Sequence, residues 1–238
     1  MNTILFDLDG TLIPMYQDEF IKSYFKRLCK RAAPYGFETE KLVTSLWQGT
    51  MAMIKNGSSK TNHDIFWEEF SAIWGEDMAK HEPVFDDFYL HEFDDVQEIL
   101  PKERDRRELI EMLKAKGYTL VLATNPVFPA VAVKTRLAWL GLEPADFSYI
   151  STYENSHFCK PNPKYFEEIL GVISKAPKDC IMIGNNTSDD MSALKLGIEC
   201  YLVTDYLENE VNTDISVFRN GNYSDLQAFL TLLPPVKK

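Results

Sequence analysis

The stretch Thr3-Ile-Leu-Phe-Asp-Leu-Asp-Gly-Thr11 decides the fold expected for this chain of 238 residues. Its apolar, β-prone first half predicts a buried strand that breaks into a loop at Gly10, leaving Asp7 and Asp9 just beyond the strand's carboxyl end. Because side chains alternate along an extended chain, the two carboxylates are expected to point to the same side. Carboxylates this close repel each other unless a cation neutralises them. Asp and Gly at this spacing are also common in solvated turns, so the motif needs its context.

Further short β-rich runs recur along the chain, and amphipathic segments separate them. The runs are Tyr118–Thr124, Phe147–Ile150, Cys180–Ile183 and Cys200–Val203. The amphipathic segments are Lys102–Lys116, Ala130–Leu140, Pro163–Lys175 and Asp189–Leu196. Glycine follows three of them, as a left-handed helix cap requires, at Gly117, Gly141 and Gly197. This alternation predicts an α/β fold with a Rossmann-like, mainly parallel sheet and helices on both faces, whose ligands bind beyond the carboxyl ends of the strands.

The segment from about Tyr16 to about Leu100 interrupts the alternation. Strand-like runs are scarce there, and apolar residues follow helical spacing at Phe20, Tyr24, Phe25 and Leu28, and again at Phe66, Phe70 and Trp74. We therefore expect a helical cap domain at residues 16–100, inserted into an α/β core domain made of residues 1–15 and 101–238. The aromatic stripes are expected to be helix cores rather than a cofactor site.

Composition and charge narrow the classes of function. The net charge of −11, with no stripe of Lys and Arg to offset it, argues against nucleic acid binding. The N-terminus lacks the basic region of an export signal, and no stretch is apolar enough to span a membrane, so we expect a cytoplasmic protein. The four cysteines form no Cys-x-x-Cys pair and the histidines show no metal-ligand spacing, which argues against a zinc site or a disulfide framework.

The segment Asp7-Leu-Asp-Gly-Thr11 resembles the first motif of the haloacid dehalogenase superfamily, Asp-x-Asp-x-Thr. Three more stretches resemble the remaining motifs in the family's order: Leu120–Asn125, an apolar strand ending in Thr; Lys160–Pro163, a Lys before a helix; and Ile181–Asp190, an acidic loop after a strand. The resemblance therefore spans Asp7 to Asp190 and leaves out only the inserted segment. It implies a hydrolase with a cap over its active site.

The resemblance also implies a role for each motif residue. Asp7 would attack phosphorus and form an aspartyl-phosphate, while Asp9 would protonate the leaving alcohol and then activate water. Asp9 argues against a dehalogenase, because family members of that type lack the second acid. Lys160 would supply a local cation and Thr124 a hydroxyl for the phosphoryl oxygens. The implied substrate-binding residues are Thr11, Thr124, Asn125 and Lys160.

A site built from carboxylates, one backbone carbonyl and waters suits Mg²⁺. The fourth motif departs from the family's Gly-Asp form, because Asn185 and Asn186 follow Gly184. A neutral amide lowers the charge of the site, so we expect weaker Mg²⁺ binding unless one of the later acids joins it; those acids could instead simply cap the next helix. The candidate ligands are Asp7, Asp9 through its carbonyl, Asn185, Asp189 and Asp190.

The leading hypothesis is a Mg²⁺-dependent phosphatase that hydrolyses a small phosphorylated metabolite. A phosphomutase or a phosphonatase shares the core motifs; the latter needs a Schiff-base lysine in the cap, and no cap lysine stands out. A catalytically weak binding protein is the third alternative, favoured by the Asn185-Asn186 pair and opposed by the retained acids, Thr124 and Lys160. The sequence leaves open the substrate, the choice between monomer and homodimer, and whether Leu230–Val236 packs on the core.

Overall fold

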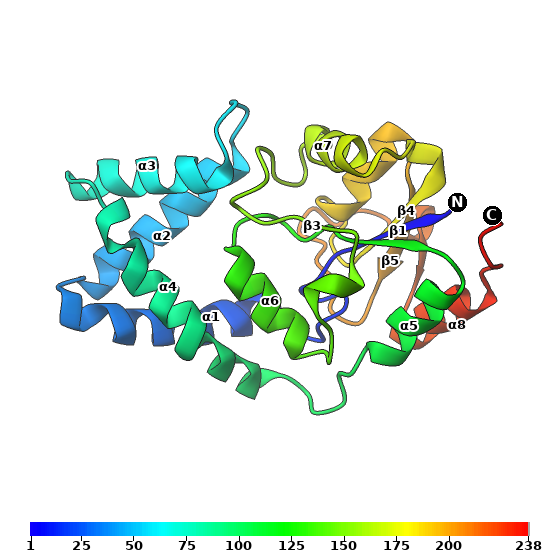
Figure 1. Ribbon diagram of the computed structural model, residues 1–238, viewed down its shortest axis with the longest axis horizontal. Helices are drawn as coiled ribbons and strands as arrows, with labels where there is room; N and C mark the ends of the chain where they lie inside the picture. Colours follow the sequence, from blue (N-terminus) through cyan, green and yellow to red (C-terminus); the bar gives the residue numbers. More distant parts are fainter. Residues whose placement is uncertain (238) are drawn as a thin grey trace.

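Six strands form a single sheet in the computed structural model, which describes residues 1–237 (Figure 1). They lie in the order β3-β2-β1-β4-β5-β6, and every pairing is parallel. Their bounds are β1 Thr3–Phe6, β2 Thr119–Leu122, β3 Tyr149–Ile150, β4 Cys180–Gly184, β5 Glu199–Val203 and β6 Arg219–Gly221. The predicted α/β fold with a parallel sheet is confirmed. The sequence predicts only five strands, because Arg-Asn-Gly in β6 carries no apolar run.

Helices cover both faces of the sheet (Figure 1). Alternate strand residues belong to different hydrophobic clusters, as the period of two requires. Leu5 and Met182 pack in one cluster with α7 (Pro163–Ile173). Ile4 and Ile183 pack in the other, which includes residues of α5 (Arg107–Ala115), α6 (Ala130–Ala138) and α8 (Tyr223–Leu232). Burial on both faces explains why these strands are continuous apolar runs.

Two of the predicted helices differ from their expected form. The helix expected at Lys102–Lys116 begins only at Arg107, whose backbone N–H donates to the Asp105 carboxylate at 2.7 Å. The segment Asp189–Leu196 forms a 3₁₀ helix over Asp190–Leu196 rather than an α-helix. The Ser192 hydroxyl donates to the Asp189 carbonyl at 2.7 Å, and such local side-chain bonds compete with the α-helical pattern. The predicted glycine caps are confirmed, since Gly117, Gly141 and Gly197 all have positive φ.

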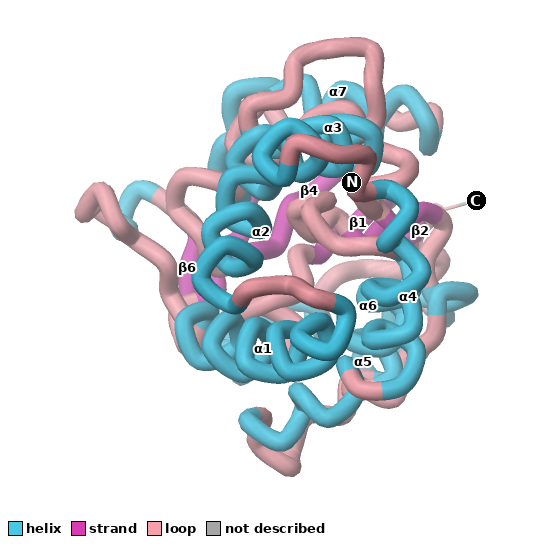
Figure 2. The backbone as a smooth tube through the Cα atoms, turned by 90° about the vertical axis from the view of Figure 1, so that its left-hand side faces the viewer, coloured by secondary structure: helices cyan, strands magenta, loops and turns pink. Residues whose placement is uncertain are grey.

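Four of the five α-helices between β1 and β2 form the inserted group that the interrupted alternation predicts, and they lie on the viewer's side of the sheet in Figure 2. They are α1 (Gln17–Ala32), α2 (Thr39–Ile54), α3 (Asn62–Trp74) and α4 (Glu82–His91), and we call them the cap. Phe20 and Phe70 are fully buried, so the aromatic stripes do form helix cores. Phe128, in the loop before α6, lies 5.8 Å from Phe20 between ring centroids, so the cap and the sheet layer share one core. The domain limits at residues 15 and 100 remain a prediction.

Short connections and the C-terminal segment complete the chain. The remaining 3₁₀ helices are Ala33–Tyr35, Ala79–His81, Phe93–Ile99, Pro144–Asp146, Pro177–Asp179 and Ile215–Val217. The C-terminal segment packs on the core, because Val236 N–H donates to the Lys116 carbonyl at 2.8 Å and the Tyr118 hydroxyl donates to the Pro234 carbonyl at 2.9 Å. All four cysteines are free and buried. Within residues 1–237, no helix combines the length and apolar character needed to cross a membrane.

Candidate active site

A cavity of about 410 Å³ lies at the carboxyl ends of β1, β2 and β4, bounded by the cap on its far side. The strand order changes direction between β1 and β4, which is where ligands of such sheets bind. Most of the predicted site residues line it: Asp7, Asp9, Thr124, Asn125, Lys160, Asn185, Asp189 and Asp190. Thr11 does not, and it is 3% exposed. Residues of α1 and α2 complete the wall.

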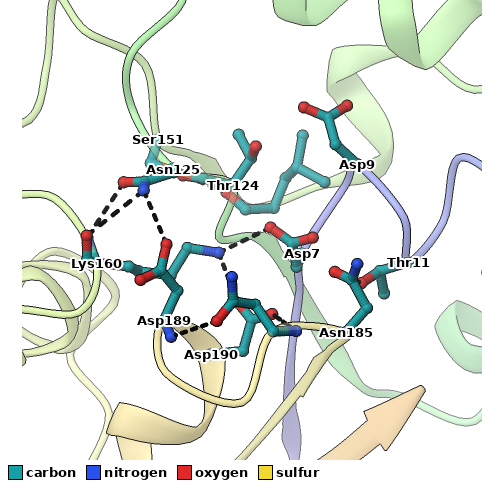
Figure 3. A network of polar contacts seen from close by, with 12 residues as sticks. Asp7, Asp9, Thr11, Thr124, Asn125, Ser151, Lys160, Asn185, Asp189 and Asp190 are labelled. Carbon is teal, nitrogen blue, oxygen red and sulfur yellow. Dashed lines mark hydrogen bonds and ion pairs between the residues drawn. The ribbon is translucent and has the colours of Figure 1, made fainter. Parts of the chain in front are cut away.

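Lys160 lies between two carboxylates at the base of the cavity (Figure 3). Its Nζ donates to Asp7 Oδ1 at 2.7 Å and to Asp190 Oδ1 at 2.6 Å. Burial disfavours the ammonium, but the two carboxylates outweigh it and hold the pKa of Lys160 well above its usual value. Lys160 is therefore a fixed cation beside Asp7. Asp190 is also held by the Asn186 N–H at 2.9 Å, so both of its oxygens have partners.

The loop after β2 is held in place through its backbone. The Thr124 carbonyl accepts hydrogen bonds from the hydroxyls of Ser151, at 2.7 Å, and Tyr165, at 2.8 Å. Among the described residues, the Thr124 hydroxyl itself has no hydrogen-bond partner, so it is available to a ligand. Asn125 accepts from the Lys160 N–H at 3.1 Å and donates to Asp189 at 3.3 Å. Asn125 thus ties three of the motifs together.

Asp9 pairs with a residue that the sequence analysis did not select. Arg136 of α6 is fully buried, donates from Nη1 to Asp9 Oδ2, and lies 4.5 Å from the centroid of the Phe128 ring. Burial raises the pKa of Asp9, and Arg136 offsets this only in part, so the pKa stays above its usual value. A signal for Arg136 was present in the sequence, because it falls on the apolar face of its helix, between Val133 and Leu137.

Replacing Arg136 with Met should lower the free energy of unfolding by about 3 kcal/mol, because a partly buried carboxylate loses its partner. Urea titration followed by circular dichroism measures this. The control is Lys134→Met, an exposed position on the same helix, which should change little. Equal stability of the two variants would show that the ion pair contributes nothing.

Asn185 is fixed by two hydrogen bonds. Its Oδ1 accepts from the Thr11 hydroxyl at 3.1 Å, and its Nδ2 donates to the Tyr206 carbonyl at 2.6 Å. Gly10 makes room for it: a Cβ there would lie 2.2 Å from Asn185 Nδ2, and φ at Gly10 is +77°. Thr11, the predicted substrate ligand, therefore does not line the cavity but orients Asn185, which does.

The oxygen atoms around Asp7 fit a hard divalent cation. Asp7 keeps one carboxylate oxygen free of Lys160, the Asp9 carbonyl accepts no backbone hydrogen bond from the described residues, and the Asn185 amide oxygen lies nearby. No group of three or more His, Cys, Asp or Glu side chains within residues 1–237 is arranged to hold a metal. The oxygens of Asp7, Asp9 and Asn185 suit Mg²⁺, which usually keeps several waters when a protein binds it.

The charge of the cavity also favours a bound cation. Its described lining contains seven acids but only one Lys or Arg, Lys160. Asp189 and Glu208 are among these acids, and burial raises the pKa of each. Asp189 makes no capping hydrogen bond to the helix that follows it. Glu208, in the loop after β5, accepts from Asn186 Nδ2 at 2.7 Å; nothing in its sequence context indicates this position. A phosphate would be repelled here unless a further cation entered with it.

Comparison with known proteins identifies the family. A family model described as haloacid dehalogenase-like hydrolase matches residues 1–197, which include all four motifs. The chain therefore belongs to the haloacid dehalogenase-like hydrolases. A similar curated protein is the pyrophosphatase PpaX of Bacillus thuringiensis (strain Al Hakam), 24% identical over 204 residues that cover 86% of this chain and 83% of that protein.

Solved structures share the fold over almost the whole chain. A HAD phosphatase from Thermococcus onnurineus has a TM-score of 0.62 at 19% identity, covering 99% of this chain and 100% of that one. The HAD-hydrolase YfnB of Bacillus subtilis, solved with magnesium, has a TM-score of 0.59 at 20% identity, covering 97% and 99%. The L-2-haloacid dehalogenase PA0810 has a TM-score of 0.60 at 17% identity, covering 97% and 99%. At these identities the likeness concerns the fold alone, and it includes both phosphatases and dehalogenases.

Proposed function

We propose that this hydrolase is a Mg²⁺-dependent phosphatase that cleaves phosphate monoesters of a small molecule. The observation that carries the proposal is Asp9, an acid with a raised pKa on the wall of the same cavity as Asp7. A second carboxyl group placed beside the nucleophile can donate a proton to a leaving alkoxide and later accept one from water. Dehalogenases of this superfamily lack that second acid. The names of the PpaX relative and of the Thermococcus phosphatase agree with the proposal.

In this proposal each motif residue has a defined role in the reaction. The Asp7 carboxylate attacks phosphorus in line, and Lys160 and the Thr124 hydroxyl hold the phosphoryl oxygens while charge develops on them. Asp9 protonates the departing alkoxide and then takes a proton from the water that hydrolyses the aspartyl-phosphate. Mg²⁺, held by Asp7, the Asp9 carbonyl and Asn185 or Asp189, would supply the positive charge that the acidic cavity lacks.

The phosphonatase alternative finds no support in the cavity lining. Phosphonate cleavage needs a lysine from the cap, and Lys160 is the only lysine among the described residues that line the cavity. The assay that separates the reaction classes compares p-nitrophenyl phosphate, phosphonoacetaldehyde and 2-chloropropionate, each with Mg²⁺ and with EDTA. We expect Mg²⁺-dependent hydrolysis of the aryl phosphate alone. Chloride release from 2-chloropropionate without metal would instead indicate a dehalogenase.

Asn185→Asp should tighten Mg²⁺ binding, because it adds a negative charge to the ligand set. The same change replaces the donor to the Tyr206 carbonyl with an oxygen, so the metal-free protein should lose about 1–3 kcal/mol of stability. Calorimetric titration with Mg²⁺ and thermal unfolding in EDTA measure the two effects. An unchanged affinity would remove Asn185 from the proposed ligand set.

A further inference from the structure

A second, smaller cavity opens beside the catalytic one. It has a volume of about 100 Å³ and extends between the cap and the loop before α6. The two cavities share the lining residues Gln17, Ile21, Trp47, Thr50, Val127 and Phe128. A molecule whose phosphate lies at Asp7 can therefore extend across these shared residues into the smaller cavity, which we call the side pocket.

The wall of the side pocket is mostly apolar and aromatic. α3 and α4 contribute Phe66, Trp67 and Phe85. The hydroxyls of Tyr24 and Tyr89 bond to each other at 2.6 Å, so each already has one partner within the protein. Among the described lining residues, Asp86 is the one Asp or Glu, and none is Lys or Arg.

The charges of the two cavities together limit the substrate. Lys160 and one bound Mg²⁺ can balance a single phosphoryl group at Asp7, against seven acids in the larger cavity. A second anionic group would enter a pocket that offers no cation and holds Asp86. Placing such a charge among apolar walls is costly unless it is paired.

We infer that the alcohol released by this enzyme is an uncharged, apolar organic group, about the size of one ring, that occupies the side pocket. The inference rests on the proposed phosphatase function and narrows its substrate class. The pocket is on the scale of the roughly 150 Å³ apolar cavities that bind benzene. The side pocket therefore predicts a substrate preference different from that of the relative named as a pyrophosphatase, because pyrophosphate carries a second anionic group.

The test compares benzyl phosphate with methyl phosphate, whose alcohols have similar acidity, and with pyrophosphate and phosphoglycolate. With the Mg²⁺-loaded full chain, kcat/KM for benzyl phosphate should exceed that for methyl phosphate by about 100-fold, the effect expected of a filled apolar pocket. Pyrophosphate and phosphoglycolate, which each carry a second anionic group, should both be poorer substrates than methyl phosphate. If kcat/KM for pyrophosphate or phosphoglycolate equals or exceeds that for methyl phosphate, the inference is overturned, while the proposed phosphatase function stands.

A matched pair of variants locates the effect. Thr50→Phe adds a ring where the two cavities meet, so the ratio of kcat/KM for benzyl over methyl phosphate should fall about tenfold or more. Met51→Phe, the next residue on α2, adds the same ring outside both cavities and should keep the wild-type ratio. A ratio that stays unchanged in Thr50→Phe would place the preference elsewhere and reject the side pocket.

Binding of phosphonates separates the two hypotheses if no ester is hydrolysed. Benzylphosphonate and methylphosphonate cannot turn over, and calorimetry measures their affinities for the Mg²⁺-loaded protein. Suppose that no ester is hydrolysed but benzylphosphonate binds at least tenfold more tightly than methylphosphonate. That result would reject the phosphatase function and retain the side pocket as a binding site. Equal affinities would reject the pocket inference as well.

Discussion

Asp7→Asn should lower kcat for p-nitrophenyl phosphate by about 10⁴-fold or more, because an amide cannot attack phosphorus and a nucleophile carries most of a covalent mechanism. The fold should persist, since Asp190 still pairs with Lys160 at 2.6 Å. Steady-state kinetics with Mg²⁺ measure the effect, and circular dichroism monitors the fold. Rapid acid quenching with ³²P-labelled phosphate ester should recover label on the wild-type chain but not on the variant.

The matched control is Asp179→Asn. Asp179 directly precedes β4 and lies at the opposite end of that strand from the cavity. The same change of charge there should leave kcat within about twofold, as for most surface substitutions away from special features. Substantial turnover by Asp7→Asn would exclude an aspartyl-phosphate on this residue. Loss of activity in both variants would trace the effect to protein charge rather than to the nucleophile.

Lys160→Met should lower both activity and stability. We expect kcat/KM to fall about 10³-fold, because the variant loses a preorganised cation at the phosphoryl group. In EDTA, the free energy of unfolding should fall by about 3–5 kcal/mol, since Asp7 and Asp190 are left buried, close together and unpaired. Kinetics and urea titration provide the two readouts.

A double variant separates the two effects of Lys160. Lys160→Met combined with Asp190→Asn removes one of the repelling carboxylates, so much of the lost stability should return while activity stays low. Lys164→Met, an exposed position in the helix that follows, should match the wild type in both readouts. Recovery of activity in the double variant would show that Lys160 acts through stability alone and does not bind phosphate.

Local patterns were sufficient to predict much of the fold. β1, β4 and β5 are buried on both faces, so they are continuous apolar runs, and Gly117, Gly141 and Gly197 end their helical segments with positive φ. β6 is a short edge strand of polar residues, and pairing with β5 rather than its own composition makes it a strand. The 3₁₀ geometry of Asp190–Leu196 likewise depends on local side-chain bonds that compete with the α-helix.

The candidate site also combines features that the sequence predicts with features that only the tertiary structure shows. The sequence by itself determined which residues follow β1, β2 and β4, because a parallel sheet gathers the carboxyl ends of its strands at one edge whatever the loops do. Asp7 and Asp9 after β1, Thr124 after β2 and Asn185 after β4 therefore meet at one cavity. Only the tertiary structure decided that Arg136 pairs with Asp9, that Thr11 orients Asn185, and that aromatic cap residues form a side pocket without a cation. These contacts join distant segments, and a local period in a sequence can show that a side chain is buried but not which partner it meets.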